Sequence, residues 1–277
     1  MTADLDREHP QGPQFVRDSY EQRWSLVEDK LRTLISRGES DLSRILHLLQ
    51  TGAKHGKKSI ASVLGYPSEL ADMLSYPAEQ PPLAIQRFAR SAIVDTVIER
   101  SERVDAIIEL GAGWGSNLFH IWARGGPDVE YHCLDFADSG LQVCDLITRT
   151  IKRGPRIRGQ QFDFRAPDFD YLTDRYRSVL VLTSSAIDKV TWLPDAFLDQ
   201  VARLAPDVEV ISFEFVGWQD QQWSQLPQQL RNQIEEGGVN RDYLPLIRSY
   251  EHRDRLRLKD FRTRAFGRNE SLIIWGN

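Results

Sequence analysis

Cysteine is scarce in this chain of 277 residues, which contains only Cys133 and Cys144. Two cysteines cannot build a disulfide framework or a cysteine-rich zinc site. Both lie in or beside apolar segments, where the expected role is that of a small buried hydrophobic side chain. The histidines also lack the spacing, with one another or with cysteine, that is typical of a metal site. We therefore expect no bound metal.

Long apolar runs and an excess of positive charge are missing as well. No apolar run approaches the ~20 residues that a helix needs to cross a bilayer. The first ten residues, MTADLDREHP, contain no apolar signal core and are more acidic than a transit peptide. The net charge of −5 argues against a chain built mainly to bind nucleic acid. We expect a cytoplasmic protein that binds neither nucleic acid nor a membrane.

The most informative segment is residues 104–117, VDAIIELGAGWGSN. A short apolar run reaches Glu109 and is followed by Gly111, Gly113 and Gly115. Such a run, bounded by glycines, is typical of a buried parallel strand, and the residues after it have helical character. Glycine allows a positive φ and places no Cβ between the backbone and a ligand. The amides at the start of the following helix point into the same space. This turn is predicted to hold a cofactor.

Two positions in this segment separate the possible cofactors. The dinucleotide pattern G-x-G-x-x-G requires glycine or alanine where this chain has Ser116. A carboxylate at Glu109 would also repel a pyrophosphate. The run instead resembles the first motif of the class I S-adenosylmethionine-dependent methyltransferases, acid-x-G-x-G-x-G. The resemblance implies S-adenosylmethionine as the cofactor, bound by Glu109, Gly111, Ala112, Gly113 and Gly115.

Later segments match the same family in order, over residues 80 to 277. A second apolar run ends in Asp135, at the ~20-residue separation from which an acid reaches ribose hydroxyls. Asp135 and Phe136 resemble the second motif of the family, whose acid binds the ribose. Asp163 and Phe164 resemble the segment whose aspartate accepts a hydrogen bond from the adenine amino group, with the aromatic neighbour holding the base.

The pattern of strands and helices predicts the fold. From residue 104 onward, apolar runs alternate with helical segments, and the chain closes with two strand-like segments, 255–261 and 271–275. The resemblance implies an α/β, doubly wound, Rossmann-like sheet of seven strands. Its expected order is 3-2-1-4-5-7-6, with strand 7 antiparallel. The closing hairpin separates this sheet from that of a dinucleotide-binding fold.

The first eighty residues have a different character. Apolar side chains recur every three or four residues over 20–35, which predicts an amphipathic helix. Ser40 or Asp41 can cap a second helix. We divide the chain into a helical cap, residues 1–80, and a methyltransferase core, residues 81–277. The cap is expected to close over the cofactor and to shape the substrate pocket. A structural or dimerising appendage, with the protein a homodimer, is the alternative.

A basic segment, residues 54–59, lies within the cap and contains His55. It is not a P-loop, because no glycine stands five residues before its Gly-Lys end. It is suited either to gripping an anionic group or to remaining a solvated loop. His55 is a candidate general base from the cap.

Methyl transfer is an in-line displacement, in which the protein mainly aligns the nucleophile. Ligands of open α/β sheets lie beyond the carboxyl ends of the strands. The polar residues to examine there are Ser184, Ser185, Asp188 and Glu214, and Ser184 is taken as a cofactor contact. Glu214 is the first candidate for orienting the acceptor or taking its proton, ahead of His55. Alternatively, Glu214 pairs with an arginine or bonds a loop backbone.

Three functions remain open. The first is a methyltransferase that acts on oxygen or nitrogen of a small molecule, natural products included. The second is a methyltransferase that acts on a peptide or protein side chain. The third is a cofactor-binding partner or regulatory protein without catalytic activity. The Asn/Asp-Pro-Pro-Tyr signature of adenine and glutamine-amide N-methyltransferases is absent, since residues 183–186 read TSSA, which disfavours those substrates.

Overall fold

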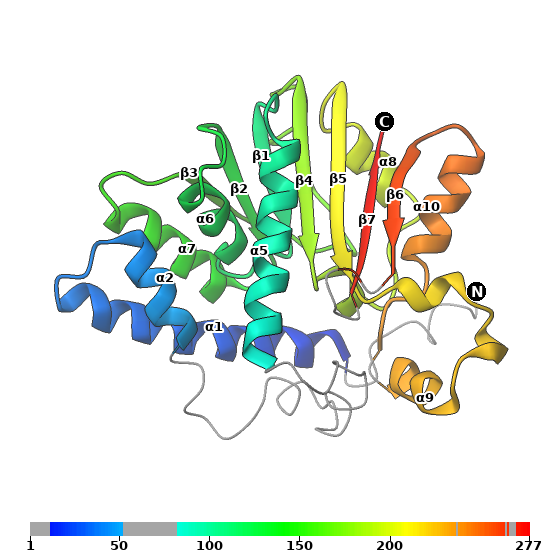
Figure 1. Cartoon of the computed structure of the whole chain (residues 1–277), viewed down its shortest axis with the longest axis horizontal. Helices are drawn as coiled ribbons and strands as arrows, with labels where there is room; N and C mark the ends of the chain where they lie inside the picture. Colours follow the sequence, from blue (N-terminus) through cyan, green and yellow to red (C-terminus); the bar gives the residue numbers. More distant parts are fainter. Residues whose placement is uncertain (1–11, 52–81, 237, 264, 266–269) are drawn as a thin grey trace.

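Seven strands form one sheet in the order β3-β2-β1-β4-β5-β7-β6 (Figure 1). The computed structural model describes residues 12–51, 82–236, 238–263, 265 and 270–277. The strands are β1 (Ala106–Leu110), β2 (Glu130–Asp135), β3 (Arg156–Gln161), β4 (Ser178–Ser184), β5 (Asp207–Glu214), β6 (Arg257–Arg262) and β7 (Ser271–Gly276). Strands β1 to β5 pair in parallel, and β7 is antiparallel to β5 and β6. The predicted strand order and the antiparallel seventh strand are confirmed.

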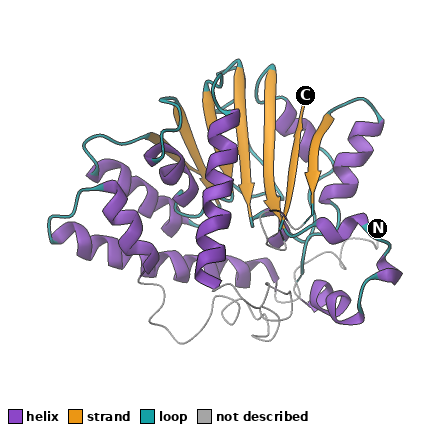
Figure 2. Ribbon diagram, viewed as in Figure 1, coloured by secondary structure: helices purple, strands orange, loops and turns teal. Residues whose placement is uncertain are grey.

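Helices cover both faces of the sheet (Figure 2). One face packs against α5 (Pro82–Arg100), α6 (Ser116–Ala123) and α7 (Asp138–Thr150), and the other against α8 (Phe197–Ala202) and α10 (Tyr243–His252). Strand side chains alternate between the two faces, so Ile107 packs with the first group of helices and Ile108 with the second. Every residue of β1 is buried, as a central strand between two helical layers requires.

The two edge strands are polar. In β3, RIRGQQ, only Ile157 is buried, and β6 carries the charged sequence RLKDFR. Charged side chains on an edge strand oppose pairing with another chain. The remaining short elements are η3 (Ile187–Lys189), which follows β4, and η4 (Gly217–Asp220), η5 (Trp223–Gln225) and α9 (Gln228–Glu236), which follow β5.

Two N-terminal helices, α1 (Gly12–Ser36) and α2 (Leu42–Thr51), pack against the sheet's own helices. Helix α1 lies across the edge where the parallel strands end, and it contacts α7, while α2 contacts α6 (Figure 1). Leu31 and Ile45 are fully buried in the same apolar cluster as α6 and α7. Asp41 caps α2, because its Oδ1 accepts a hydrogen bond from the backbone N–H of Arg44 at 2.8 Å.

The predicted boundary between cap and core, near residue 80, lies outside the described residues. Of the helices that the structure describes, none is both long and apolar enough to span a membrane.

Candidate functional site

The glycine-rich turn leads directly from β1 into α6. Gly111, Gly113 and Gly115 have φ angles of 70°, 57° and 74°, a region that residues with a Cβ rarely adopt. Space is restricted at two of them. A Cβ on Gly111 would stand 2.4 Å from the Cβ of Ala186, and one on Gly113 would stand 2.7 Å from Cζ2 of Trp24. Both the backbone conformation and the close neighbours therefore require glycine at these positions.

Four buried carboxylates lie at the same edge of the sheet as this turn. The exposed fraction is 1% for Glu109, 4% for Asp135, 2% for Asp188 and 0% for Glu214. Within the described part of the chain, these are the only buried acids. They come from the carboxyl ends of β1, β2 and β5 and from η3 just after β4, and these four strands are adjacent in the sheet. Parallel pairing thus gathers four acids around one edge.

Asp135 ties the end of β2 to the glycine turn. Its Oδ2 accepts a hydrogen bond from the backbone N–H of Gly113 at 2.7 Å, and its Oδ1 accepts one from Ala137 at 2.9 Å. Burial raises the pKa of Asp135 to about 6, although the bonds from backbone amides act in the opposite direction. Each carboxylate oxygen carries two lone pairs, so the group retains capacity to accept further hydrogen bonds.

Glu109 and the segment after β3 have partners that the sequence analysis did not foresee. Oε1 of Glu109 accepts a hydrogen bond from Nδ2 of Asn117, in the first turn of α6, at 2.6 Å. Asp163 forms an ion pair with Arg165, Oδ2 to Nη2, at 2.9 Å. Burial alone would raise the pKa of Asp163, but the bonds from Arg165 and its charge lower it. The buried Phe164 ring lies 3.2 Å from the position of a Cβ on Gly111.

Glu214 holds the backbone that follows β4. Its Oε2 accepts hydrogen bonds from the backbone N–H groups of Ala186 at 3.0 Å and Asp188 at 3.1 Å. These contacts are of the loop-bonding kind that the sequence analysis kept as an alternative. Burial, and then the charge of Asp188, raise the pKa of Glu214 to about 8. Ser184 ends β4, and Ser185 has a φ of 51°, so the chain turns sharply here.

Helix α1 contacts the glycine turn, the residue after β2 and the start of α7 through three side chains. The Glu21 carboxylate accepts hydrogen bonds from the N–H groups of Asp138 at 2.7 Å and Ser139 at 2.9 Å, which open α7. The Trp24 ring lies against Gly113. Tyr20 packs edge-on against Phe136, with ring centroids 5.6 Å apart. This helix was predicted as part of a cap over the cofactor, but a helical period carries no information on which of its side chains make the contacts.

His55 and the basic segment 54–59 lie outside the described residues. The role of His55 as the alternative base therefore stays a prediction.

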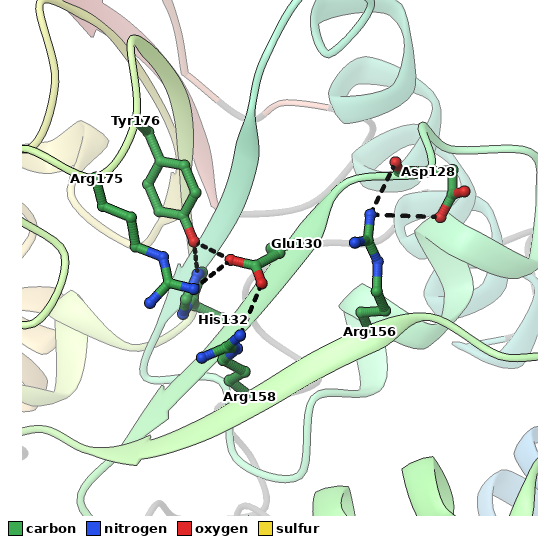
Figure 3. A network of polar contacts seen from close by, with 7 residues as sticks. All are labelled: Asp128, Glu130, His132, Arg156, Arg158, Arg175 and Tyr176. Carbon is green, nitrogen blue, oxygen red and sulfur yellow. Dashed lines mark hydrogen bonds and ion pairs between the residues drawn. The ribbon is translucent and has the colours of Figure 1, made fainter.

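A second polar cluster occupies the opposite edge of the sheet, where β1, β2 and β3 begin (Figure 3). Glu130 accepts hydrogen bonds from Arg158 at 2.9 Å, from Arg175 at 2.8 Å and from the Tyr176 hydroxyl. His132 shares a 2.7 Å hydrogen bond with the same hydroxyl, and burial lowers its pKa to about 4. An open cavity of about 650 Å³ lies beside this cluster.

The charges around that cavity balance. Its lining includes three arginines and three acids: Arg156, Arg175, Arg177, Asp105, Asp128 and Glu130. The carboxyl edge differs, because it gathers four buried acids beside a turn that needs glycine. The candidate functional site is therefore at the carboxyl edge.

The chain was compared with known proteins. No family model and no curated protein matches it. Among solved structures, an S-adenosylmethionine-dependent methyltransferase from Aquifex aeolicus matches with a TM-score of 0.43 and 11% identity, over 71% of this chain and 98% of that one. Human N-acetylserotonin methyltransferase, in complex with S-adenosylmethionine, matches with a TM-score of 0.44 and 13% identity, over 91% of this chain and 67% of that one. A geranyl diphosphate methyltransferase, in complex with geranyl diphosphate and sinefungin, matches with a TM-score of 0.46 and 12% identity, over 74% of this chain and 84% of that one.

The sheet has the strand order and the antiparallel seventh strand of the Rossmann-like methyltransferase fold. At these identities and TM-scores, the matches assign this chain neither a family nor an activity. The cofactor and the acceptor have to be inferred from the residues at the carboxyl edge.

Proposed function

We propose that this chain is an S-adenosylmethionine-dependent methyltransferase that acts on an oxygen or nitrogen atom of a small molecule, natural products included. The observation that carries the proposal is the set of four buried acids beside the glycine turn, of which Glu214, with a pKa of about 8, is mainly protonated at neutral pH. Buried charge is costly unless a partner of opposite charge offsets it. Lys189, 2.8 Å from Asp188, offsets part of it. A cationic sulfonium is attracted to such an edge, whereas a pyrophosphate is repelled.

The residues present fit this cofactor. Glycine is required at two positions of the turn, where Ala186 and Trp24 approach the backbone too closely for a Cβ. Asp135 has remaining acceptor capacity for ribose hydroxyls, and the ring of Phe164 lies at the turn where an adenine would stack. Asp163 would share its carboxylate between the adenine and Arg165. The proposed contacts are Glu109, Gly111, Ala112, Gly113, Gly115, Asp135, Phe136, Asp163, Phe164 and Ser184.

The cofactor supplies a methyl group that is already activated by its sulfonium, so the chain has to bind, align and exclude water. Glu214 acts here as a positioning residue, because its carboxyl group fixes the backbone from Ala186 to Asp188. Trp24 of α1 lies against Gly113 of the turn, and Tyr20 packs against Phe136. A helix across this edge favours a small acceptor over a protein surface, which needs an open groove.

The proposal is tested by calorimetric titration with S-adenosylmethionine, S-adenosylhomocysteine and NAD, followed by a screen for methylated products by mass. The screen would contain small phenols, carboxylic acids and amines, and separately a peptide library. We expect the first two ligands to bind, NAD not to bind, and a small molecule to gain one methyl group. Turnover of peptides alone would contradict the small-molecule assignment. Binding without turnover in either set would indicate a regulatory partner, and no binding would overturn the proposal.

A further inference from the structure

Asp188 has one carboxylate oxygen that the protein leaves unpaired. The side chain is 2% exposed, and its Oδ2 lies 2.8 Å from Nζ of Lys189. Its Oδ1 is buried and has no hydrogen-bond partner among the described residues. Buried polar atoms are almost always satisfied in folded proteins, so an orphaned carboxylate oxygen at a candidate site requires an explanation. A ligand that donates a hydrogen bond would provide it.

The position of Asp188 is fixed from the side of β5. Glu214, at the end of that strand, accepts the backbone N–H of Asp188 at 3.1 Å and that of Ala186 at 3.0 Å. The short helix η3 is therefore held at its first turn by a fully buried side chain. An anchored backbone fixes the direction of the Asp188 carboxylate, which is what a binding residue needs in order to discriminate between ligands.

Tyr20 of α1 approaches Asp188 from the other side. Its ring packs edge-on against Phe136, with ring centroids 5.6 Å apart. Burial raises the pKa of Tyr20; Lys189 and Arg23 act to lower it, while Asp188 and Asp135 act to raise it. The hydroxyl thus lies within the electrostatic reach of the ends of both β2 and β4.

We propose that Oδ1 of Asp188, together with the Tyr20 hydroxyl, binds the N–H or O–H of the methyl acceptor. The inference rests on the proposed function and narrows it. The acceptor carries its own hydrogen-bond donor at the reacting atom, as an alcohol, a phenol or an amine does, and a thioether does not. Asp188 is then the residue that selects the acceptor, and Glu214 is the residue that positions Asp188.

Sinefungin tests this without knowledge of the natural acceptor. It is an analogue of S-adenosylmethionine in which an amine replaces the methyl-bearing sulfonium, so it places N–H donors where the acceptor meets the methyl group. The measurement is the ratio of the Kd values of S-adenosylhomocysteine and sinefungin, in wild type and in Asp188→Asn. We expect the substitution to reduce the preference for sinefungin roughly ten- to hundredfold, because a charged hydrogen bond is lost. The affinity for S-adenosylhomocysteine should change little.

The control is Asp145→Asn, which removes an equal charge from an exposed ion pair on α7, where the carboxylate lies 2.8 Å from Arg149. This variant should keep the wild-type ratio. An unchanged ratio in Asp188→Asn would overturn the inference. Failure of wild type to bind either compound would instead overturn the proposed function itself, so the two failures are distinguishable.

A second approach covers the case in which Asp188→Asn does not fold, as circular dichroism would show. Tyr20→Phe removes only the hydroxyl and keeps the contact with Phe136, and it should lower the sinefungin preference several-fold. A crystal structure of wild type with sinefungin should place the amine within ~3.2 Å of Oδ1 of Asp188. An amine that points away from both groups would contradict the assignment.

Discussion

Substitution of Glu214 by glutamine should change how the stability of the protein depends on pH. The carboxyl group is fully buried, accepts two well-formed hydrogen bonds from backbone amides and lies next to the charge of Asp188. Its pKa is about 8 in the folded protein, against an ordinary value of 4.5. At pH 6 the group is mainly protonated, so glutamine reproduces its shape and its lack of charge.

The sign follows from proton linkage. Between pH 4.5 and 8 the folded state holds a proton on Glu214 that the unfolded state has released, so wild type loses stability as the pH rises. Each pKa unit corresponds to about 1.4 kcal/mol, and the loss between pH 5 and pH 8 is therefore roughly 3 to 4 kcal/mol. Glu214→Gln lacks this loss. Its stability relative to wild type should rise across the same window.

The assay is urea unfolding at pH 4, 5, 6, 7 and 8, with the difference between variant and wild type taken at each pH. The matched control is Glu209→Gln, near the other end of β5. Burial would raise the pKa of Glu209, but hydrogen bonds and charge from Lys259 and Arg100 lower it. Glu209→Gln should lower the free energy of unfolding at neutral pH, and should lower it by less at pH 4. Parallel profiles of Glu214→Gln and wild type would refute the assigned environment of Glu214.

Three further substitutions test the glycine turn and its neighbours. Gly113→Ala should destabilise the fold by at least ~1–2 kcal/mol in urea unfolding, because φ is 57° and the new Cβ would stand 2.7 Å from the Trp24 ring. An unchanged unfolding midpoint would mean that α1 does not lie on this turn. Asp135→Ala should weaken S-adenosylmethionine binding roughly ten- to hundredfold in calorimetry, since bonds to a charged group are lost, whereas Asp145→Ala should not. Glu21→Gln should cost about 1 kcal/mol at pH 7 by removing a charge from the amides that open α7. The pKa of Glu21 is lowered, since its hydrogen bonds from Ser139 and Asp138 outweigh burial, so this cost should vanish as the pH falls below 4.5; a cost that persists at pH 3 would point to packing instead.

The sheet was predictable because its signals are local. The runs that became β1, β2, β4, β5 and β7 are apolar and end near glycine, acid or serine, and each is buried in the fold. The glycine turn was predictable for the same reason, since glycine at three alternate positions of residues 111–115 indicates positive φ angles. Strand β3 has one buried residue, Ile157, and its polar sequence gives no comparable signal. Its place came only from the resemblance to a family.

The partners of the site residues were not predictable. Arg165 lies two residues after Asp163 and forms an ion pair with it. No rule of sequence spacing predicts an ion pair at this separation. The contact of Trp24 with Gly113 joins positions far apart in the chain. Glu214 was placed at the right strand end, but whether its carboxylate would meet a ligand or the backbone of Asp188 depended on the path of the chain after β4. Such contacts are fixed by tertiary packing rather than by local pattern.

The most direct test of the account is calorimetric titration of the full chain with S-adenosylmethionine at pH 7.5, in parallel with NAD. The claim under test is that the buried acids Glu109, Asp135 and Asp188 at one sheet edge, beside a turn that requires glycine, bind a cationic cofactor. The account predicts one binding site for S-adenosylmethionine and no heat of binding for NAD. Binding of NAD that competes with S-adenosylmethionine, or no binding of either, would contradict it.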